Sequence, residues 1–294
     1  MQNFKPIELC DKSVFDNYFA QDPPQTSELT FTNLFMWRGR YCPVWREWNG
    51  NLLIVARPEG EEPFGLPPTG TGDKVEAIDY LCTCLEKISP EARVGRVDKA
   101  FVEQFVDRNH YRVIEDRDNS DYVYLTEDLI NLPGNKFHGK KNFVNQFLKS
   151  REFEYRELDA SMVNLFLDLQ EAWCELKDCS EDQALIHEDW AVFTALKHHG
   201  ELGFTGGGIL INSKVEAFAL GEMLNPDTAV IHIEKANPEI PGIYAAINQL
   251  FCQNAWSHAT YINREQDLGV EGLRKAKLSY HPHHMVEKFT VIRR

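Results

Sequence analysis

Two side chains that can carry a proton lie close together near the C-terminal end of the chain. Residues 227–236 read DTAVIHIEKA, and their alternation puts His232 and Glu234 on one face and two isoleucines on the other. This period of two is typical of a β-strand with one buried face. Imidazoles and carboxylates act as general acids and bases, so this strand is a candidate site. The alternative for Glu234 is a structural ion pair with Lys235 or with a neighbouring strand.

A second polar stretch follows the next predicted strand, residues 260–263. It contains five side chains that could bind a ligand: Asn263, Glu265, Asp267, Arg274 and Lys277. Arg274 and Lys277 are three residues apart and so share one face of a helix. A polar stretch after two strands and the helix between them lies where open α/β sheets usually bind ligands. The alternative is a solvated turn and helix, with Asp267 as the helix N-cap.

The predicted helices and strands around these residues follow a repeated order. Apolar residues at helical spacing over 242–257 predict a helix between the two strands. Across the chain we find the same order twice: a strand, one or two helices, an antiparallel meander, then helix, strand, helix and strand. The first meander includes a hairpin at Asn49-Gly50, a dipeptide that favours tight turns. We therefore expect an α+β fold of two domains, residues 1–135 and 136–294, with mixed, mostly antiparallel sheets flanked by helices and an inter-domain helix near 139–150.

The composition indicates a folded protein without broad affinity for nucleic acid. Hydrophobic residues make up 43% of the 294 residues, enough to bury a substantial core. The net charge of −14 argues against nonspecific binding to phosphates, which requires many cations. Two stretches, 136–151 and 264–294, are locally basic. They could contact a charged tRNA. Ordinary charge fluctuation is the alternative for both stretches.

Cysteine and hydropathy patterns predict a cytoplasmic protein. The seven cysteines are scattered and form no C-x-x-C motif, so reduced thiols are the simplest expectation. The N-terminus has no apolar signal sequence, and no window approaches 18 uninterrupted apolar residues. We therefore expect no integral membrane segment. The histidines at 281, 283 and 284 lack an acid or a cysteine at ligand spacing, so no metal site is predicted.

Several long segments resemble one known family. They are GKKNFVNQF at 139–147, IHIEKA at 231–236, INREQDLGVEGLRKAKLSYHP at 262–282 and the terminal KFTVIRR. These resemble the C-terminal domains of phosphatidylglycerol lysyltransferases, and the order of elements is similar to the N-acetyltransferase (GNAT) fold present twice. The resemblance covers nearly the whole chain. It implies two fused acyltransferase-like domains with a shared cleft, which move an aminoacyl group from aminoacyl-tRNA to an amine or hydroxyl of a lipid head group, peptide or small molecule.

The resemblance also implies roles for individual residues. Glu234 would accept a proton from the acceptor, with His232 as its substitute, and Tyr280 would protonate the leaving group. A core aromatic is the alternative for Tyr280. Two further groups would bind substrate, the first by holding an α-amino group or a phosphate and the second by closing the cleft. The first group is Asn263, Glu265, Asp267, Arg274 and Lys277, and the second is Lys141, Asn142 and Asn145.

The chain differs from typical N-acetyltransferases at the loop that binds coenzyme A. N-acetyltransferases usually bind the pyrophosphate of coenzyme A through a Q/R-x-x-G-x-G/A loop after the fourth strand. The corresponding NPEIPGIYA at 237–245 keeps Gly242 but lacks the leading cation and the second glycine, and PPTGTGD at 67–73 is no better match. We therefore predict no bound cofactor, and we favour aminoacyl-tRNA over acyl-coenzyme A as the donor. The alternatives are a non-catalytic ligand-binding protein of this fold and a coenzyme A-dependent N-acetyltransferase.

Overall fold

The computed structural model describes residues 3–294 and divides into two compact units. The first comprises Met1–Asp121, Gln266–Val270 and Met285–Arg294, and the second comprises Tyr122–Glu265 and Glu271–His284. Each unit therefore takes chain from both halves of the sequence. Residues 122–135, which we expected in the first domain, belong to the second unit, and residues 285–294 belong to the first.

The first unit contains a sheet in the order β1-β2-β3-β4-β6-β15-β7, with β5 paired to β3. Its strands are β1 (Lys5–Pro6), β2 (Val44–Trp48), β3 (Asn51–Ala56), β4 (Phe64–Gly65), β5 (Thr69–Gly70), β6 (Arg93–Asp98), β7 (Tyr111–Glu115) and β15 (Lys288–Arg293). Its α-helices are α1 (Lys12–Gln21), α2 (Phe31–Met36), α3 (Arg38–Tyr41), α4 (Lys74–Leu85) and α5 (Lys99–Phe105). The pairing of β4 with β6 is parallel. The predicted hairpin is confirmed, with Asn49 and Gly50 at φ 45° and 74° between β2 and β3.

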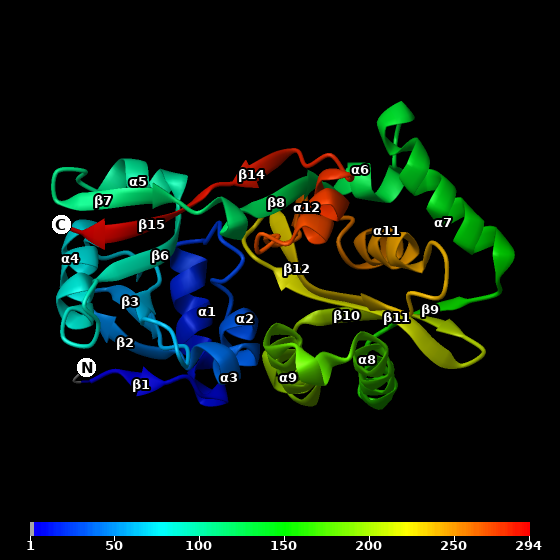
Figure 1. Ribbon diagram of the computed structural model, residues 1–294, viewed down its shortest axis with the longest axis horizontal. Coiled ribbons are helices and arrows are strands. Elements are labelled where there is room, and N and C mark those ends of the chain that lie inside the picture. Colours follow the sequence, from blue (N-terminus) through cyan, green and yellow to red (C-terminus); the bar gives the residue numbers. More distant parts are fainter. Residues whose placement is uncertain (1–2) are drawn as a thin grey trace. The chain divides into compact units, whose positions relative to one another are not determined.

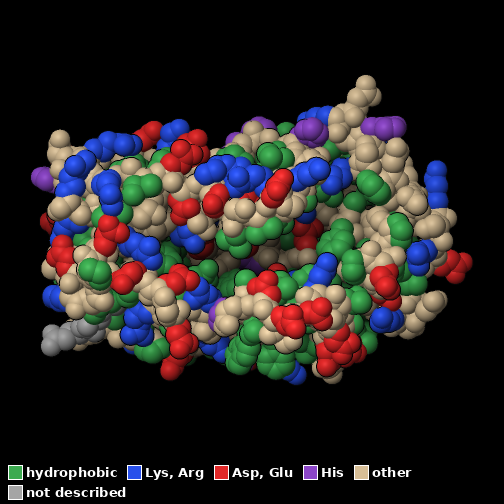
Figure 2. Space-filling view, in the orientation of Figure 1, with side chains coloured by type: hydrophobic (Ala, Val, Ile, Leu, Met, Phe, Trp, Pro, Cys, Tyr) green, Lys and Arg blue, Asp and Glu red, His purple; other side chains and the backbone are tan. Residues whose placement is uncertain are grey.

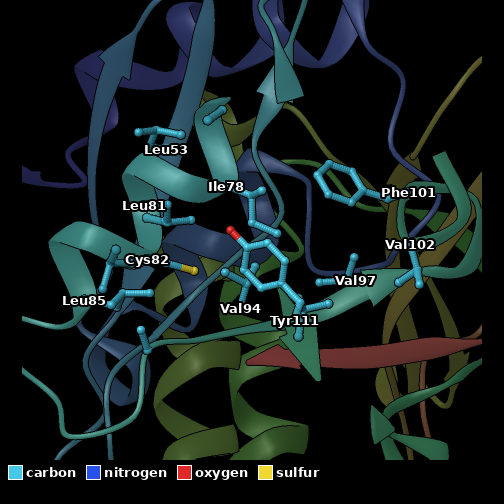
Figure 3. Packing of buried hydrophobic residues seen from close by; sticks show 14 of the residues in the cluster. Leu53, Ile78, Leu81, Cys82, Leu85, Val94, Val97, Phe101, Val102 and Tyr111 are labelled. Carbon is cyan, nitrogen blue, oxygen red and sulfur yellow. The ribbon is translucent and has the colours of Figure 1, made fainter. Parts of the chain in front are cut away.

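Both faces of this sheet are covered, as the alternation along β2 shows. Val44 joins a buried cluster with Leu53, Ile78 and Leu81, which places α4 on that face (Figure 3). The next residue, Trp45, points the other way and packs on Phe15 of α1, with ring centroids 5.0 Å apart. Because β3 lies between these two layers, all six of its residues are buried. A strand buried on both faces is the expected result of helices on both sides of a sheet.

The glycine-rich loop before α4 is a packed connector. The Gly70 N–H donates to the Asp22 carboxylate at 2.9 Å, and Lys74 Nζ donates to the Gly70 carbonyl at 2.6 Å. A Cβ on Gly72 would lie 2.0 Å from the Asn49 carbonyl oxygen. These glycines are therefore required by close approach of the backbone, and the loop packs on the β2–β3 turn.

The second unit contains a sheet in the order β14-β8-β13-β12-β11-β10-β9. Its strands are β8 (Asp121–Leu125), β9 (Glu154–Glu157), β10 (Thr205–Ile211), β11 (Lys214–Met223), β12 (Thr228–Ala236), β13 (Tyr261–Asn263) and β14 (His284–Val286). Its α-helices are α6 (Thr126–Asn131), α7 (His138–Ser150), α8 (Val163–Lys177), α9 (Gln183–Lys197), α10 (His199–Leu202), α11 (Ile243–Ala255) and α12 (Glu271–Leu278). Helix α11 covers one face of this sheet, and α8 and α9 lie on the other (Figure 1).

The cysteines differ from expectation at one place. Cys174 near the end of α8 and Cys179 in the following turn form a disulfide, whereas the other five are free. The two meet because Asp178, at φ 51°, reverses the chain directly after α8. In residues 3–294 no helix combines the length and the hydropathy needed to cross a bilayer.

Candidate active site

The candidate site lies where two neighbouring strands of the second unit separate. Strand β12 pairs in parallel with β13 over three residue pairs, which end at Val230 and Asn263. Beyond this point β12 continues to Ala236, whereas the chain after β13 turns away through Glu265 at φ 56°. The side chains of Glu234 and Arg264 meet across the opening.

Glu234 holds two neighbours through its carboxylate. Its Oε2 accepts a hydrogen bond from Arg264 Nε at 3.0 Å and a second bond from Nη2 of the same guanidinium. Its Oε1 accepts from Asn248 Nδ2 of α11 at 3.0 Å. The ion pair with a neighbouring strand, the alternative stated above, is thus present. The role of Glu234 as a general base stays a prediction.

Arg264 is a buried cation held between rings. Its side chain is 14% exposed. The guanidinium carbon lies 4.7 Å from the centroid of Tyr280 and 5.7 Å from that of Tyr124. Burial lowers the pKa of Arg264, but the charge of Glu234, the two tyrosines and the hydrogen bond to Glu234 together outweigh burial and raise the pKa above its usual range. The guanidinium is therefore a fixed positive charge in surroundings of low polarity, where its interactions are strengthened.

Two polar atoms of this cluster have no protein partner. Arg264 Nη1 and Asn248 Oδ1 are both buried without a hydrogen bond to any described residue. Leaving a buried polar atom unpaired costs about 1–3 kcal/mol. One of the two atoms is a donor and the other an acceptor, and both belong to side chains that Glu234 holds in place. Nη1 could donate to an acceptor, and Oδ1 could accept from a donor.

Tyr280 and Lys140 complete the cluster. Lys140 of α7 places its Nζ 4.2 Å from the centroid of the Tyr280 ring. Burial lowers the pKa of Lys140, and the charge of Arg264 lowers it further. Burial raises the pKa of Tyr280 to about 12 although Arg264 opposes it. Tyr280 thus keeps its proton at neutral pH, while Lys140 loses its proton more readily than an ordinary lysine.

His232 lies in a separate acidic setting on the same strand. Its Nδ1 is 2.7 Å from Glu265 Oε1, and its Nε2 is 3.0 Å from Glu222 Oε1. Burial lowers the pKa of His232, but hydrogen bonds to both carboxylates outweigh burial and raise it to about 9. The imidazole is therefore a cation at neutral pH with no lone pair for a proton. The substitute-base role predicted for His232 would require a pH above this value.

We expect the ring of His232 to remain doubly protonated at pH 7.5. Its folded pKa of about 9 lies above the unfolded value of 6.5. The stabilising effect of the charged ring is complete below pH 6.5 and is lost as pH rises through 9. The free energy of unfolding should therefore fall by about 2–3 kcal/mol between pH 7 and pH 10. Ring ¹⁵N shifts measured by NMR across this range test the point. A ring that is already neutral at pH 7 would contradict the geometry described.

Three more of the predicted residues lie in three different settings. Asn263 is fully buried and uses its Oδ1 to accept from the Glu265 N–H at 2.8 Å. Lys277 donates from Nζ to the Arg264 carbonyl, so it holds the backbone beside the cluster. Asp267 belongs to the first unit, where it is buried and bonds to Arg117 and to the Gly269 N–H. Asp267 is thus outside the Glu234 cluster.

The remaining predicted residues lie on helices. Arg274 is half-buried on α12. Lys141, Asn142 and Asn145 are exposed on α7, and their predicted part in closing a cleft stays a prediction. The pattern missed Arg264, Asn248 and Lys140. Lys140 precedes the predicted Lys141 by one position, and one step along a helix turns a side chain by about 100°.

The residue that precedes α11 packs against α7. Gly242 precedes α11 at φ 83°, and a Cβ there would lie 2.3 Å from the Phe143 carbonyl oxygen. A helix N-terminus binds phosphate only when its backbone N–H groups can be reached. At this position the backbone of α7 lies against Gly242, and no other glycine of the expected loop is present. The segment therefore does not match a pyrophosphate-binding loop.

Comparison with solved structures shows the fold. A conserved protein of unknown function from Bacteroides thetaiotaomicron matches with a TM-score of 0.93 and 33% identity over 100% of both chains. The L-PGS structure from Bacillus licheniformis matches with a TM-score of 0.70 and 13% identity over 100% of this chain and 94% of that chain. A tandem GNAT protein from the clavulanic acid biosynthesis pathway matches with a TM-score of 0.52 and 8% identity over 99% and 97%. The expected α+β fold with two GNAT-like domains is confirmed.

Sequence comparison agrees. An uncharacterised protein of Mycoplasmoides gallisepticum is 24% identical over 181 residues, which span 59% of this chain and 56% of that protein. The family model described as "Phosphatidylglycerol lysyltransferase, C-terminal" matches residues 19–292. The resemblance inferred from the sequence is thereby confirmed, and the chain belongs to the family of phosphatidylglycerol lysyltransferase C-terminal domains.

Proposed function

We propose that the second unit transfers an aminoacyl group from aminoacyl-tRNA to an amine or hydroxyl acceptor. Membership of the family and the GNAT-like fold support a transferase of acyl groups. The observation that carries the proposal further is the pair of unpaired buried atoms, Arg264 Nη1 and Asn248 Oδ1. An aminoacyl ester offers a carbonyl oxygen, which accepts hydrogen bonds, beside an α-ammonium, which donates them.

The carbonyl oxygen of the ester would face Arg264 Nη1. When the acceptor attacks the carbonyl carbon, negative charge develops on this oxygen, and a fixed buried cation stabilises it. The α-ammonium would donate to Asn248 Oδ1. Glu234 would then act as a positioning residue, because it fixes both side chains through its two oxygens.

Tyr280 and Lys140 supply the proton route. In the proposed step, nitrogen of a neutral acceptor amine forms the new bond to the carbonyl carbon, and the bond to the ribose oxygen breaks. Tyr280 gives its proton to that oxygen, and the new amide nitrogen passes its surplus proton to Lys140 in its neutral form. Return of one proton from Lys140 to Tyr280 restores both groups. The lowered pKa of Lys140 suits its task because it brings the pKa nearer to the working pH. Burial of Tyr280 keeps its hydroxyl protonated until the leaving oxygen takes the proton.

The donor assignment agrees with other features of the chain. Gly242 packs on the α7 backbone, which argues against coenzyme A at the start of α11. The stretch 136–151 carries five cations and no carboxylate. It offers a local surface for tRNA phosphates although the chain has a net negative charge. The acceptor would be a lipid head group, a peptide or a small molecule. Because charged tRNA is the donor in this proposal, the cytoplasm is the compartment we infer.

A transfer assay tests the proposal. The chain is incubated with a mixed pool of radiolabelled aminoacyl-tRNAs and cell extract, and the product that gains label is identified. We expect labelled product from the wild type and a rate lower by roughly 10²-fold or more for Tyr280→Phe, which keeps the ring and removes the proton. The matched control is Tyr244→Phe on α11, whose hydroxyl contacts Trp173 instead of the cluster.

Three results would count against the proposal. They are no labelled product from any aminoacyl-tRNA, an equal rate for Tyr280→Phe and wild type, or acetyl transfer from acetyl-coenzyme A as the only reaction. If aminoacyl-tRNA raised the melting temperature of the protein without any transfer, the result would indicate a non-catalytic ligand-binding protein of this fold.

A further inference from the structure

A cavity lies in the second unit, between α8 and α9 and apart from the Glu234 cluster. It has a volume of about 850 Å³, which is within the range of pockets that hold small organic ligands. Its lining comes wholly from residues 167–193. None of the residues assigned above to aminoacyl transfer contributes to it.

Part of the wall of this cavity is acidic. Glu171, Glu175, Asp178 and Asp189 line it, and the charge of Asp189 also acts on Lys235, which pairs with Glu188. Several carboxylates around one concave site favour a positively charged ligand. Hydrophobic and acidic side chains gather over α8 and α9 on the visible face (Figure 2).

Other parts of the wall are apolar and aromatic. Leu167 and Ile186 line the cavity together with Trp190 and Phe193. Trp190 is 57% exposed and Phe193 is 46% exposed, high values for such large apolar side chains. The ring faces of tryptophan and phenylalanine attract organic cations. This wall therefore suits the apolar body of a ligand whose charge meets the carboxylates.

The lining also holds a buried amide with an unused acceptor. Gln170 is 2% exposed, and its Nε2 donates to Asp189 Oδ1 at 3.0 Å. Its Oε1 is buried and has no partner among the described residues. A buried acceptor of this kind is costly unless a donor reaches it, and an ammonium group brings up to three donors. This observation is independent of the acidic wall and points to the same chemistry.

A disulfide and a helix cap lie at one end of the cavity. Cys174 and Cys179 both line it, and their disulfide ties the end of α8 to the turn before α9. Asp182 then caps α9 by accepting from the N–H groups of Ala184 and Leu185. These two contacts connect the ends of the two helices that line the cavity.

We propose that the cavity between α8 and α9 is a binding site for a small organic cation with an aromatic or aliphatic body. The charged group would lie among the carboxylates and reach Gln170 Oε1. The apolar body would lie on Trp190 and Phe193. This site is separate from the Glu234 cluster and does not depend on the function proposed for that cluster.

Calorimetry with three matched probes tests the proposal. Tryptamine carries the charge, tryptophol is its neutral counterpart, and indole-3-propionate is an anion of similar shape. We expect tryptamine to bind at least tenfold more tightly than tryptophol, a difference of about 1.4 kcal/mol, and indole-3-propionate not to bind. Added salt should weaken tryptamine binding because it screens the carboxylates.

Variants separate this cavity from adventitious binding. Glu171→Gln/Glu175→Gln should weaken tryptamine about tenfold, whereas Glu59→Gln/Glu103→Gln, which removes two exposed carboxylates of the first unit, should leave the affinity unchanged. Thermal melts of both variants confirm that they are folded. No saturable heat with tryptamine, equal affinity for tryptamine and tryptophol, or equal weakening by both double variants would overturn the proposal.

Discussion

Replacing Arg264 with lysine should lower the kcat of aminoacyl transfer by roughly 10²–10³-fold, as loss of one oxyanion donor does. Lysine keeps a positive charge opposite Glu234, so the ion pair across the opening between β12 and β13 is retained. Lysine has no equivalent of Nη1, the buried donor without a protein partner. The interaction that is lost is therefore the one proposed to form as charge develops on the carbonyl oxygen.

The control is the same substitution at Arg112, whose guanidinium pairs with Glu91 on the surface of the first unit. Arg112→Lys should leave kcat unchanged, and circular dichroism should show both variants folded. A change confined to KM would mean that Arg264 binds donor and transition state equally. Wild-type kcat in Arg264→Lys would remove Arg264 from the chemistry.

Replacing Lys288 with methionine should lower the free energy of unfolding of the first unit by about 3–5 kcal/mol. This is the usual cost of removing one partner of a buried ion pair and leaving the other. Lys288 lies in β15 and is fully buried. Its Nζ donates to Asp121 Oδ1 and to Glu28 Oε2, each at 2.6 Å. Without the ammonium, both carboxylates would lose this short ion pair, and Glu28 would keep Arg96, whose Nε lies 3.2 Å from its Oε1.

The pH dependence of this cluster follows from the same contacts. Burial lowers the pKa of Lys288, but Asp121 and Glu28 outweigh burial and raise it above 10.5. A raised lysine pKa contributes stability that is complete below pH 10.5 and is lost as pH rises through the folded value. Hydrogen exchange of β6 and β15 amides in the variant measures the effect locally, since a chain of two units need not unfold in one step.

Two further variants make the Lys288 result specific. Lys99→Met removes an exposed lysine that pairs with Glu287 and should leave exchange in β6 and β15 unchanged. Lys288→Met/Asp121→Asn removes charge from both sides and should recover part of the loss. Exchange in Lys288→Met as slow as in wild type would show that the buried ammonium does not stabilise the sheet.

Local patterns in the sequence predict much of this fold. Asn49-Gly50 marks the β2–β3 turn, and the alternation around His232 marks β12. Such signals depend on neighbouring residues, so they can be read from one sequence. The pairing of β15 with β6 and β7, and of β8 with β13, joins segments far apart in the chain. No local pattern specifies those pairings, so the predicted boundary at 135/136 differs from the two units.

The candidate site was predictable only in part for the same reason. The sequence places Glu234 on a polar strand face and Tyr280 at the end of a polar stretch, and both belong to the cluster. Arg264 looks like one charge among many in residues 263–277. Its burial depends on the divergence of β12 from β13, which is a property of the folded sheet. The pKa of His232 likewise depends on Glu222, which is brought near by the pairing of β11 with β12.

The most direct measurement is a crystal structure of the chain with a non-hydrolysable aminoacyl-adenosine amide. We expect the carbonyl oxygen of the analogue to accept from Arg264 Nη1 at about 3 Å and its ammonium to donate to Asn248 Oδ1. Binding of the analogue at another place, with Nη1 and Oδ1 still out of its reach, would contradict the account.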